Sequence, residues 1–179
     1  MKKYTEKYKN HSKNIIVLTG HMGSGKTSIA KALAKSLGWR FYDSDFEIER
    51  KQGISIKGIF DTKGEKYFRK LEKEIIHELF NNKFSIISLG GGSIINKTVR
   101  KLIEKKAISI FLKVDINVLL KRLKKNYKKR PLLIESNIKD IISQLNIERL
   151  KYLERADIIV ENNKNINETI KIINEAIIK

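Results

Sequence analysis

The chain has 179 residues, of which 41% are hydrophobic and 32% are charged, a balance typical of one folded domain with a sizeable core. No apolar run approaches the roughly 18 residues of a membrane span, and the basic residues 1–14 lack the apolar segment of a secretory signal. The absence of cysteine excludes disulfides and thiolate chemistry, so we expect a cytoplasmic protein with no membrane partner. The formal charge of +18 fits either nucleic acid or small polyanions such as nucleotides.

Strand and helix patterns alternate along the first half of the chain. The apolar, β-branched run "IIVLT" at 15–19 predicts a buried strand that ends at glycines. Apolar residues recur every fourth position after Lys26 until Gly38, which predicts a helix over that stretch. "WRFYD" predicts a second short strand, and residues 65–81 gather their apolar side chains on one helical face.

The same alternation continues through the second half. "FSIISLGGG", "AISIFLKV" and "ADIIV" predict three further strands, and helical spacing occurs at 116–125, 137–155 and 165–178. The segment "NYKKRPLLIES", which holds the chain's single proline, predicts a loop between two of these helices. Alternating strands and helices predict an α/β fold with a parallel sheet covered on both faces, and functional residues at the carboxyl ends of its strands.

Residues 20–27, "GHMGSGKT", match the P-loop pattern G-x-x-x-x-G-K-[ST] between a predicted strand and a predicted helix. In this motif backbone N–H groups and a helix N-terminus surround the phosphates of ATP or GTP. Lys26 would reach the β- and γ-phosphates, and the Thr27 hydroxyl would help to hold Mg²⁺. The residues expected to bind the nucleotide here are Gly23, Ser24, Gly25, Lys26, Thr27 and Ser28.

Two carboxylates, Asp43 and Asp45, lie one residue apart after the second strand, and they leave it on the same side. Either could hold a magnesium-bound water, bind an acceptor hydroxyl or take its proton. The alternatives are an exposed turn or an N-cap for a helix that starts near Phe46. The next strand ends in "SLGGG" at 88–92. These glycines either let backbone N–H groups approach a ligand closely or form a loose turn. Because this strand lacks an acidic Walker B residue, Asp43 becomes the candidate magnesium carboxylate.

Three arginines are candidates for anion binding, namely Arg69, Arg130 and Arg149. A guanidinium binds a carboxylate or phosphate with two parallel hydrogen bonds, which an ammonium cannot do. Each of the three could equally be a solvated charge on a helix or loop. The three histidines show no metal-ligand spacing, and Trp39 is expected to pack in the core.

In series, these motifs resemble shikimate kinase, a family of small P-loop kinases of aromatic amino-acid (chorismate) biosynthesis. The matching segments, between residue 15 and about 160, are "GHMGSGKTSIAKALAKSLGWRFYDSDFEIE", "GISIKGIFDTKGEKYFRKLEKEII", "SLGGG", "RPLL" and "ERAD". The resemblance implies ATP-dependent phosphorylation of the 3-hydroxyl of shikimate by a three-layer P-loop kinase fold with a five-stranded parallel sheet and a mobile lid. We therefore expect one monomeric kinase domain over 15–179, a lid near 124–137 and a disordered basic tail over 1–14.

The resemblance also implies roles on the acceptor side. Asp45 corresponds to the aspartate that binds the substrate hydroxyls and is a candidate base, while Asp43 corresponds to the aspartate near the magnesium ion. A pair of arginines, Arg69 and Arg149, would clamp the substrate carboxylate. The backbone N–H groups of Gly91 and Gly92 would donate to the substrate.

On the nucleotide side, the resemblance implies that Arg130 closes with the lid over the transferring phosphate and that Arg122 flanks the adenine. This chain departs from the family pattern at two places. Around Arg149 the family has R-x-P-x-Y followed by three residues and Ala, whereas "RLKYLERA" lacks the proline and is one residue shorter. The lid has one extra residue between Arg122 and Arg130.

Two other functions are compatible with parts of this pattern. A P-loop kinase for gluconate or a nucleoside monophosphate would share the fold, but it would not need two arginines and a glycine triplet arranged for a carboxylate and a diol. A nucleic-acid-binding P-loop protein would explain the charge of +18, yet the sequence has no base-reading motif. The primary prediction is a member of the shikimate kinase family that acts on a small molecule and not on nucleic acid.

Overall fold

In the computed structural model the described residues are 13–125, 138–163 and 165–178. The tail expected over 1–14 lies almost entirely outside them, and so does most of the lid expected near 124–137, including Arg130. Among the helices within these ranges, none is both long enough and apolar enough to cross a membrane.

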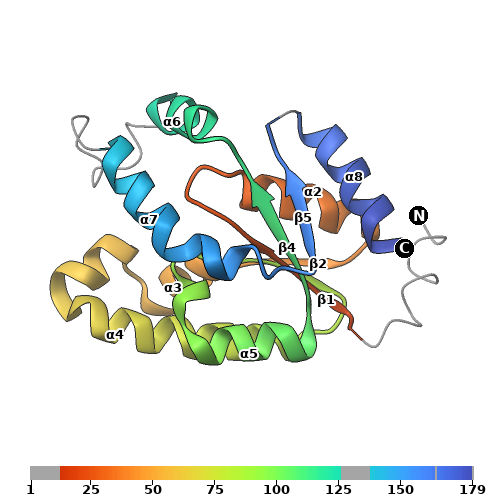
Figure 1. Cartoon of the computed structure of the whole chain (residues 1–179). Coiled ribbons are helices and arrows are strands. Elements are labelled where there is room, and N and C mark those ends of the chain that lie inside the picture. Colours follow the sequence, from red (N-terminus) through yellow and green to blue (C-terminus); the bar gives the residue numbers. More distant parts are fainter. Residues whose placement is uncertain (1–12, 126–137, 164, 179) are drawn as a thin grey trace.

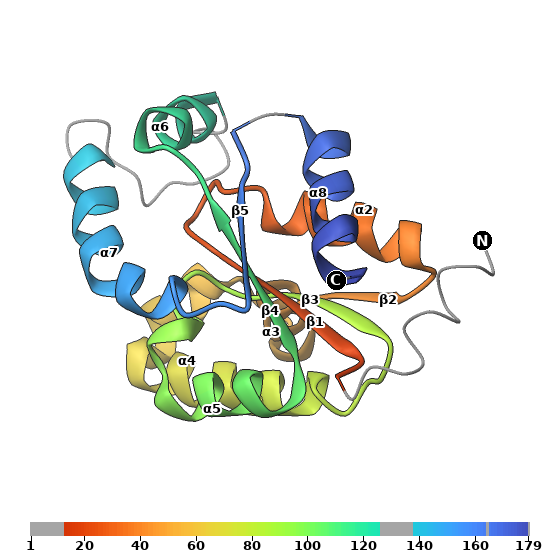
Figure 2. The ribbon, with the colours of Figure 1, turned by 45° about the vertical axis from the view of Figure 1, so that its right-hand side comes forward.

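A five-stranded parallel sheet forms the centre of the fold, with strand order β2-β3-β1-β4-β5 (Figure 2). The strands are β1 (Ile15–Thr19), β2 (Arg40–Asp43), β3 (Ser85–Ser88), β4 (Ile108–Lys113) and β5 (Ile158–Glu161). Each coincides with a predicted strand, and β1, β3 and most of β4 are buried between the two helical layers, as is typical of parallel strands. The chain leads from β1 to β2 on one side and from β4 to β5 on the other. The order in which strands are added to the sheet therefore reverses direction beside β1, and open α/β sheets bind their ligands at such a point.

Helices cover both faces of this sheet (Figure 1). In the described residues they are α2 (Lys26–Leu37), α3 (Ser44–Gln52), α4 (Ile56–Leu79), the 3₁₀ helix η1 (Ser93–Ile95), α5 (Lys97–Lys106), α6 (Ile116–Lys125), α7 (Ile138–Leu153) and α8 (Ile166–Ile178). Helices α2 and α8 pack on one face, and α3, α4, α5 and the end of α7 pack on the other. Side chains of β1 alternate between the two layers, with Ile16 and Leu18 facing α2 and with Ile15 and Val17 facing α4. The predicted three-layer α/β architecture is confirmed.

Two helices differ from the predicted pattern. Helix α4 begins at Ile56, nine residues before the predicted start at 65, because the Ser55 hydroxyl caps it by accepting from the Gly58 N–H. Its two parts meet at Gly64, whose φ of 76° and ψ of 171° are not helical. Helix α5 has no counterpart among the predicted helices, since only two of its residues are buried.

The strand register brings the predicted functional segments to one edge of the sheet. Ser88 of β3 pairs with Leu18 of β1 and with Asp43 of β2. The P-loop, the Asp-Ser-Asp segment and the glycine triplet each begin within two residues of these positions. Their side chains and N–H groups therefore share the carboxyl edge, as expected for a parallel sheet.

Candidate active site

The P-loop runs from the end of β1 into the first turn of α2. Gly25 is the N-cap of α2 and adopts the left-handed region (φ 89°, ψ 12°), which favours glycine. The Lys26 ammonium donates to the carbonyl oxygens of Gly20 and His21, both at 2.9 Å. The N-terminus of α2 adds the partial positive charge of its helix dipole at this point. The loop therefore offers the cationic, donor-rich surroundings that a phosphate chain requires.

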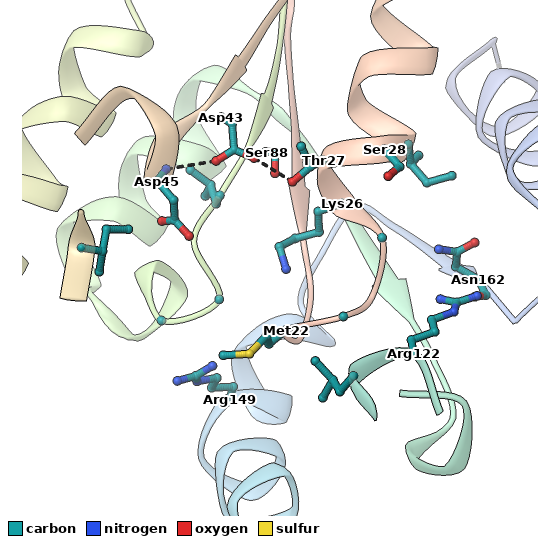
Figure 3. A pocket seen from close by; sticks show the side chains of 18 of the residues that line it. Met22, Lys26, Thr27, Ser28, Asp43, Asp45, Ser88, Arg122, Arg149 and Asn162 are labelled. Atoms are coloured by element: carbon teal, nitrogen blue, oxygen red, sulfur yellow. Dashed lines mark hydrogen bonds between the residues drawn. The ribbon is translucent and has the colours of Figure 1, made fainter. Parts of the chain in front are cut away.

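A buried asparagine supports the P-loop from the end of β5. The Asn162 amide donates to the Ser24 carbonyl at 2.7 Å, and its side-chain oxygen accepts from Thr169 of α8 at 2.8 Å. Its backbone carbonyl accepts from Arg122 at 2.8 Å, which places Arg122 beside Asn162 (Figure 3). Ser24 is fully buried and its N–H donates to His21, so this residue lies behind the loop.

Asp43 caps helix α3 and also contacts the first turn of α2. Its Oδ1 accepts from the backbone N–H groups of Asp45 at 3.1 Å and Phe46 at 3.3 Å, which makes it the N-cap of α3. Its Oδ2 accepts from the Thr27 hydroxyl at 2.7 Å (Figure 3). A hydroxyl and a carboxylate that both line the cavity fit Mg²⁺, which prefers oxygen ligands and shares them with substrate phosphates. Within the described residues there is no group of three or more acidic or histidine side chains that would hold a metal without such help.

Asp45 faces the cavity from the first turn of α3 (Figure 3). In the described part of the chain its carboxylate has no hydrogen-bond or ion-pair partner, and it lies so close to Gly90 that a side chain there would collide with it. The pKa of Asp45 is raised from 3.8 to about 6, first by burial and then by the charges of Asp43 and Glu72, while the charge of Lys26 acts in the opposite direction. A carboxyl group with such a pKa can exchange a proton close to neutral pH.

The glycine triplet 90–92 forms the wall between Asp45 and two arginines. The N–H groups of Gly91 and Gly92 have no acceptor among the described residues, and both glycines line the cavity. A Cβ on Gly91 would lie 3.2 Å from Nη1 of Arg149, and one on Gly92 would lie 2.7 Å from Nη1 of Arg69. Glycine at these positions lets both guanidinium groups lie directly against the loop, and any larger side chain would displace them.

Arg69 is held by two glutamates of its own helix. Its Nη1 donates to Glu72 at 2.9 Å, and its Nε and Nη2 donate to Glu65 at 3.2 Å. Glu72 is buried and also accepts from the Ser93 hydroxyl at 2.7 Å. Burial alone would lower the pKa of Arg69, but the charge and hydrogen bonds of Glu72, followed by those of Glu65, raise it. The guanidinium is therefore charged and already oriented beside Gly92.

Arg149 reaches the same end of the cavity from α7 (Figure 3). Its Nε is buried and has no hydrogen-bond partner among the described residues. Burial lowers the pKa of Arg149, and the charge of Arg69 lowers it further, against the opposing charges of Glu148 and Glu72. An anion near both guanidinium groups would relieve this repulsion. The shortened "RLKYLERA" motif thus still presents Arg149 to the cavity.

Most of the predicted site residues line one cavity of about 920 Å³ at the carboxyl edge of the sheet. Figure 3 shows Arg122 and Asn162 on one side of Lys26, and Asp45 and Arg149 on the other. The predicted residues that line it are Gly23, Gly25, Lys26, Thr27, Ser28, Asp43, Asp45, Gly91, Gly92, Arg122 and Arg149. Arg69 lies at its edge against Gly92, and Arg130 lies outside the described residues.

Several supporting residues cannot be singled out from short sequence motifs. The buried Ser44 hydroxyl accepts from the Gly90 N–H at 2.9 Å and so links the Asp-Ser-Asp segment to the glycine triplet. Asn162 likewise reaches a P-loop carbonyl that is 138 residues away in sequence. Glu72 does leave a signal, because it lies four residues after Phe68 on the apolar face of α4, where a charged residue needs a partner.

The raised pKa of Asp45 predicts a pH-dependent cost to the fold. The folded-state pKa of about 6 exceeds the ordinary 3.8, so the fold favours the protonated carboxyl group. The stability that this group contributes is fully present below pH 3.8 and is lost as the pH rises through about 6. At pH 8 the ionised carboxylate would cost no more than about 3 kcal/mol. We expect Asp45→Asn to raise Tm at pH 8 and to have little effect near pH 4, as measured by thermal unfolding. The exposed Asp61→Asn serves as control; an equal gain from Asp45→Asn at both pH values would contradict the prediction.

The fold and the cavity define a P-loop kinase, an enzyme that binds a nucleoside triphosphate at the loop and a small acceptor beside it. The chain belongs to the shikimate kinase family, whose model matches residues 22–178. Shikimate kinase of Buchnera aphidicola subsp. Baizongia pistaciae is 40% identical over 154 residues, which cover 84% of this chain and 88% of that protein. The solved structure of shikimate kinase from Acinetobacter baumannii in complex with shikimate has a TM-score of 0.88 and 31% identity, and the match covers 97% of this chain and 96% of that one.

A more distant structure shares the fold alone. The gluconokinase from Sinorhizobium meliloti 1021 is 19% identical, with a TM-score of 0.53 and 90% of each chain covered. At this identity the likeness extends to the P-loop kinase architecture and carries no information about the acceptor.

Proposed function

We propose that the protein transfers the γ-phosphoryl group of ATP to the 3-hydroxyl of shikimate, giving shikimate 3-phosphate and ADP. The observation that carries this proposal is the meeting of Asp45, which has no protein partner among the described residues, with Arg69 and Arg149 beside the P-loop. Shikimate has one carboxylate and three hydroxyls, so two guanidinium groups and one carboxylate are complementary to it. The relative from Acinetobacter baumannii binds shikimate on the same fold.

On the nucleotide side, the P-loop N–H groups and Lys26 would bind the β- and γ-phosphates, with Arg122 beside the adenine. The Lys26 ammonium already lies inside the loop, where it would exchange carbonyl partners for phosphate oxygens. Thr27 and Asp43 would hold Mg²⁺. The ion, when bound, supplies charge neutralisation on the transferring phosphoryl group.

On the acceptor side, Arg69 and Arg149 would hold the substrate carboxylate, and the N–H groups of residues 91–92 would donate to its oxygens. Asp45 would accept the proton of the 3-hydroxyl while that oxygen attacks the γ-phosphorus. The bond from the γ-phosphorus to the bridging oxygen breaks and ADP leaves. Because transfer depends mainly on positioning, the pre-oriented arginine pair is the part of the site that selects the acceptor.

The alternative acceptors fit these residues less well. Gluconate lacks a ring that holds a carboxylate and a diol at fixed separation, and a nucleoside monophosphate would not need two arginines together with Asp45, Gly91 and Gly92 at the cavity. We infer that the protein acts as a monomer on a small molecule, without nucleic acid.

The test is ADP release from ATP by the purified full chain, with and without shikimate. We expect turnover that requires shikimate and Mg²⁺, is abolished by EDTA and yields shikimate 3-phosphate by mass spectrometry. D-gluconate and AMP at the same concentration serve as control acceptors and should give only the rate of ATP alone. Shikimate-independent turnover, or a faster rate with either control acceptor, would overturn the proposal.

A further inference from the structure

Arg100 of α5 connects the turn after the glycine triplet to the helix that carries Arg149. Its Nη1 donates to the carbonyl oxygens of Ile94 at 2.9 Å and Ile95 at 2.6 Å, both in η1. Its Cζ lies 3.9 Å from the centre of the Tyr152 ring, three residues after Arg149 on α7. The Arg100 side chain therefore contacts both η1 and α7, the two elements that meet beside Arg149.

The turn η1 also supports the other arginine of the site. The Ser93 hydroxyl donates to buried Glu72 at 2.7 Å, and Glu72 accepts from Arg69 at 2.9 Å. Arg69 is thereby linked to η1 through Glu72 and Ser93. The helix turn that carries Arg149 is linked to η1 through Tyr152 and Arg100. The three-residue turn is the shared support of two guanidinium groups that come from different helices.

Arg149 has particular need of such support. Its Nε has no hydrogen-bond partner among the described residues, and the charge of Arg69 repels it. Arg69, by contrast, is fixed by two glutamates. The position of Arg149 therefore depends on how its helix turn packs, and Tyr152 is the side chain of that turn that Arg100 contacts.

We propose that Arg100 is a positioning residue for the acceptor: it holds the turn of α7 that carries Arg149 against η1 and so sets the spacing of the two arginines that bind the substrate carboxylate. This role rests on the proposed function, because it assigns Arg100 to the acceptor half of the same site. It requires an arginine, since a planar guanidinium can stack on a ring with its face while an edge N–H donates to carbonyl groups.

The test compares KM for shikimate with KM for ATP in three variants. We expect Arg100→Met to raise KM for shikimate about tenfold and to leave kcat and KM for ATP within about twofold, because only the carboxylate contact is misplaced. Arg100→Lys should behave similarly, since an ammonium cannot both stack and donate in this way. Tyr152→Leu removes the ring that Arg100 contacts, so it should also raise KM for shikimate while leaving kcat and KM for ATP nearly unchanged. The exposed Lys101→Met is the control and should match wild type. Thermal unfolding identifies any variant that does not fold, and Arg100→Lys or Tyr152→Leu then carries the test.

A double variant tests whether Arg100 acts through Arg149. In an Arg149→Met background, adding Arg100→Met should leave KM for shikimate unchanged, because the group being positioned is gone. Additive effects would overturn the proposal, as would equal increases in both KM values or an unchanged KM for shikimate in the folded single variants. Absence of shikimate-dependent turnover in wild type would overturn the proposed function and this role with it, whereas normal wild-type turnover with unaffected variants would overturn only the role of Arg100.

Discussion

Replacing Asp45 with asparagine is expected to lower kcat by about 10²- to 10⁴-fold, the usual contribution of a positioned general base. Asparagine fills the same space against Gly90 but cannot take a proton from the acceptor hydroxyl. Because burial and neighbouring carboxylates raise the pKa of Asp45 to about 6, wild-type kcat/KM should fall as the pH drops through this value. Steady-state rates between pH 5 and pH 8 measure both the loss of kcat and the pH dependence. The residual activity of the variant should lack the fall in kcat/KM at low pH, which we call the acid limb of the profile.

The neighbouring Asp43 provides the matched control. Asparagine at this position can still accept from the N–H groups of Asp45 and Phe46, so the N-cap of α3 is kept. It is a weaker ligand for Mg²⁺, so Asp43→Asn should raise the Mg²⁺ concentration that is needed for half-maximal rate while retaining the acid limb. An unchanged kcat in Asp45→Asn, or loss of the limb in Asp43→Asn instead, would remove Asp45 as the base.

The strands and the sheet edge could be predicted because their signals are local. A run such as "IIVLT" has one favourable environment, between two helical layers, and its position fixes where the P-loop must begin. Once the fold class is known, parallel strands place Asp43 and the glycine triplet at the same edge as the P-loop. The edge at which the cavity lies therefore follows from the order of short motifs along the chain, whereas the acceptor roles of its residues rest on the family resemblance.

The early start of α4 and the existence of α5 follow from capping rather than periodicity. Ser55 accepts from an N–H group in the first turn of α4 and Asn96 from N–H groups in the first turn of α5, and in neither case does the pattern of apolar residues mark where the helix begins. Ser44 and Asn162 escape prediction for another reason, since each hydrogen-bonds a partner that is brought near only by the completed sheet. Buried polar contacts of this kind depend on tertiary packing and leave no spacing in the sequence.

Arg149 reaches the cavity although the motif around it is shorter than the family pattern. The family pattern around it is one residue longer and includes a proline, so residue spacing alone does not show where its side chain points. In the structure the guanidinium lies against Gly91 and lines the cavity. A helix displaces a side chain by about 100° per residue, and a long, flexible arginine can compensate for such a shift when its turn is held in place.

Replacing Arg69 with lysine is expected to raise KM for shikimate about a hundredfold, because two charge-assisted hydrogen bonds to the carboxylate contribute roughly this much. The guanidinium orients itself by donating to Glu72 and Glu65 while it stays beside Gly92. A lysine ammonium is a compact point charge on a flexible stem, and it would be drawn to buried Glu72 and away from the substrate. Steady-state kinetics at saturating ATP should show the change in KM for shikimate, with KM for ATP unaffected.

The same substitution at Arg50 controls for the general effect of exchanging arginine for lysine. Arg50 makes an exposed ion pair with Glu47 on α3 and has a side chain that is 67% exposed, so Arg50→Lys should match wild type in both KM values. A rise in KM for ATP together with that for shikimate would mean that Arg69 supports the whole cavity through Glu72 and is not specific to the carboxylate. An unchanged KM for shikimate in Arg69→Lys would show that a point charge is sufficient, and the anion would then depend mainly on Arg149.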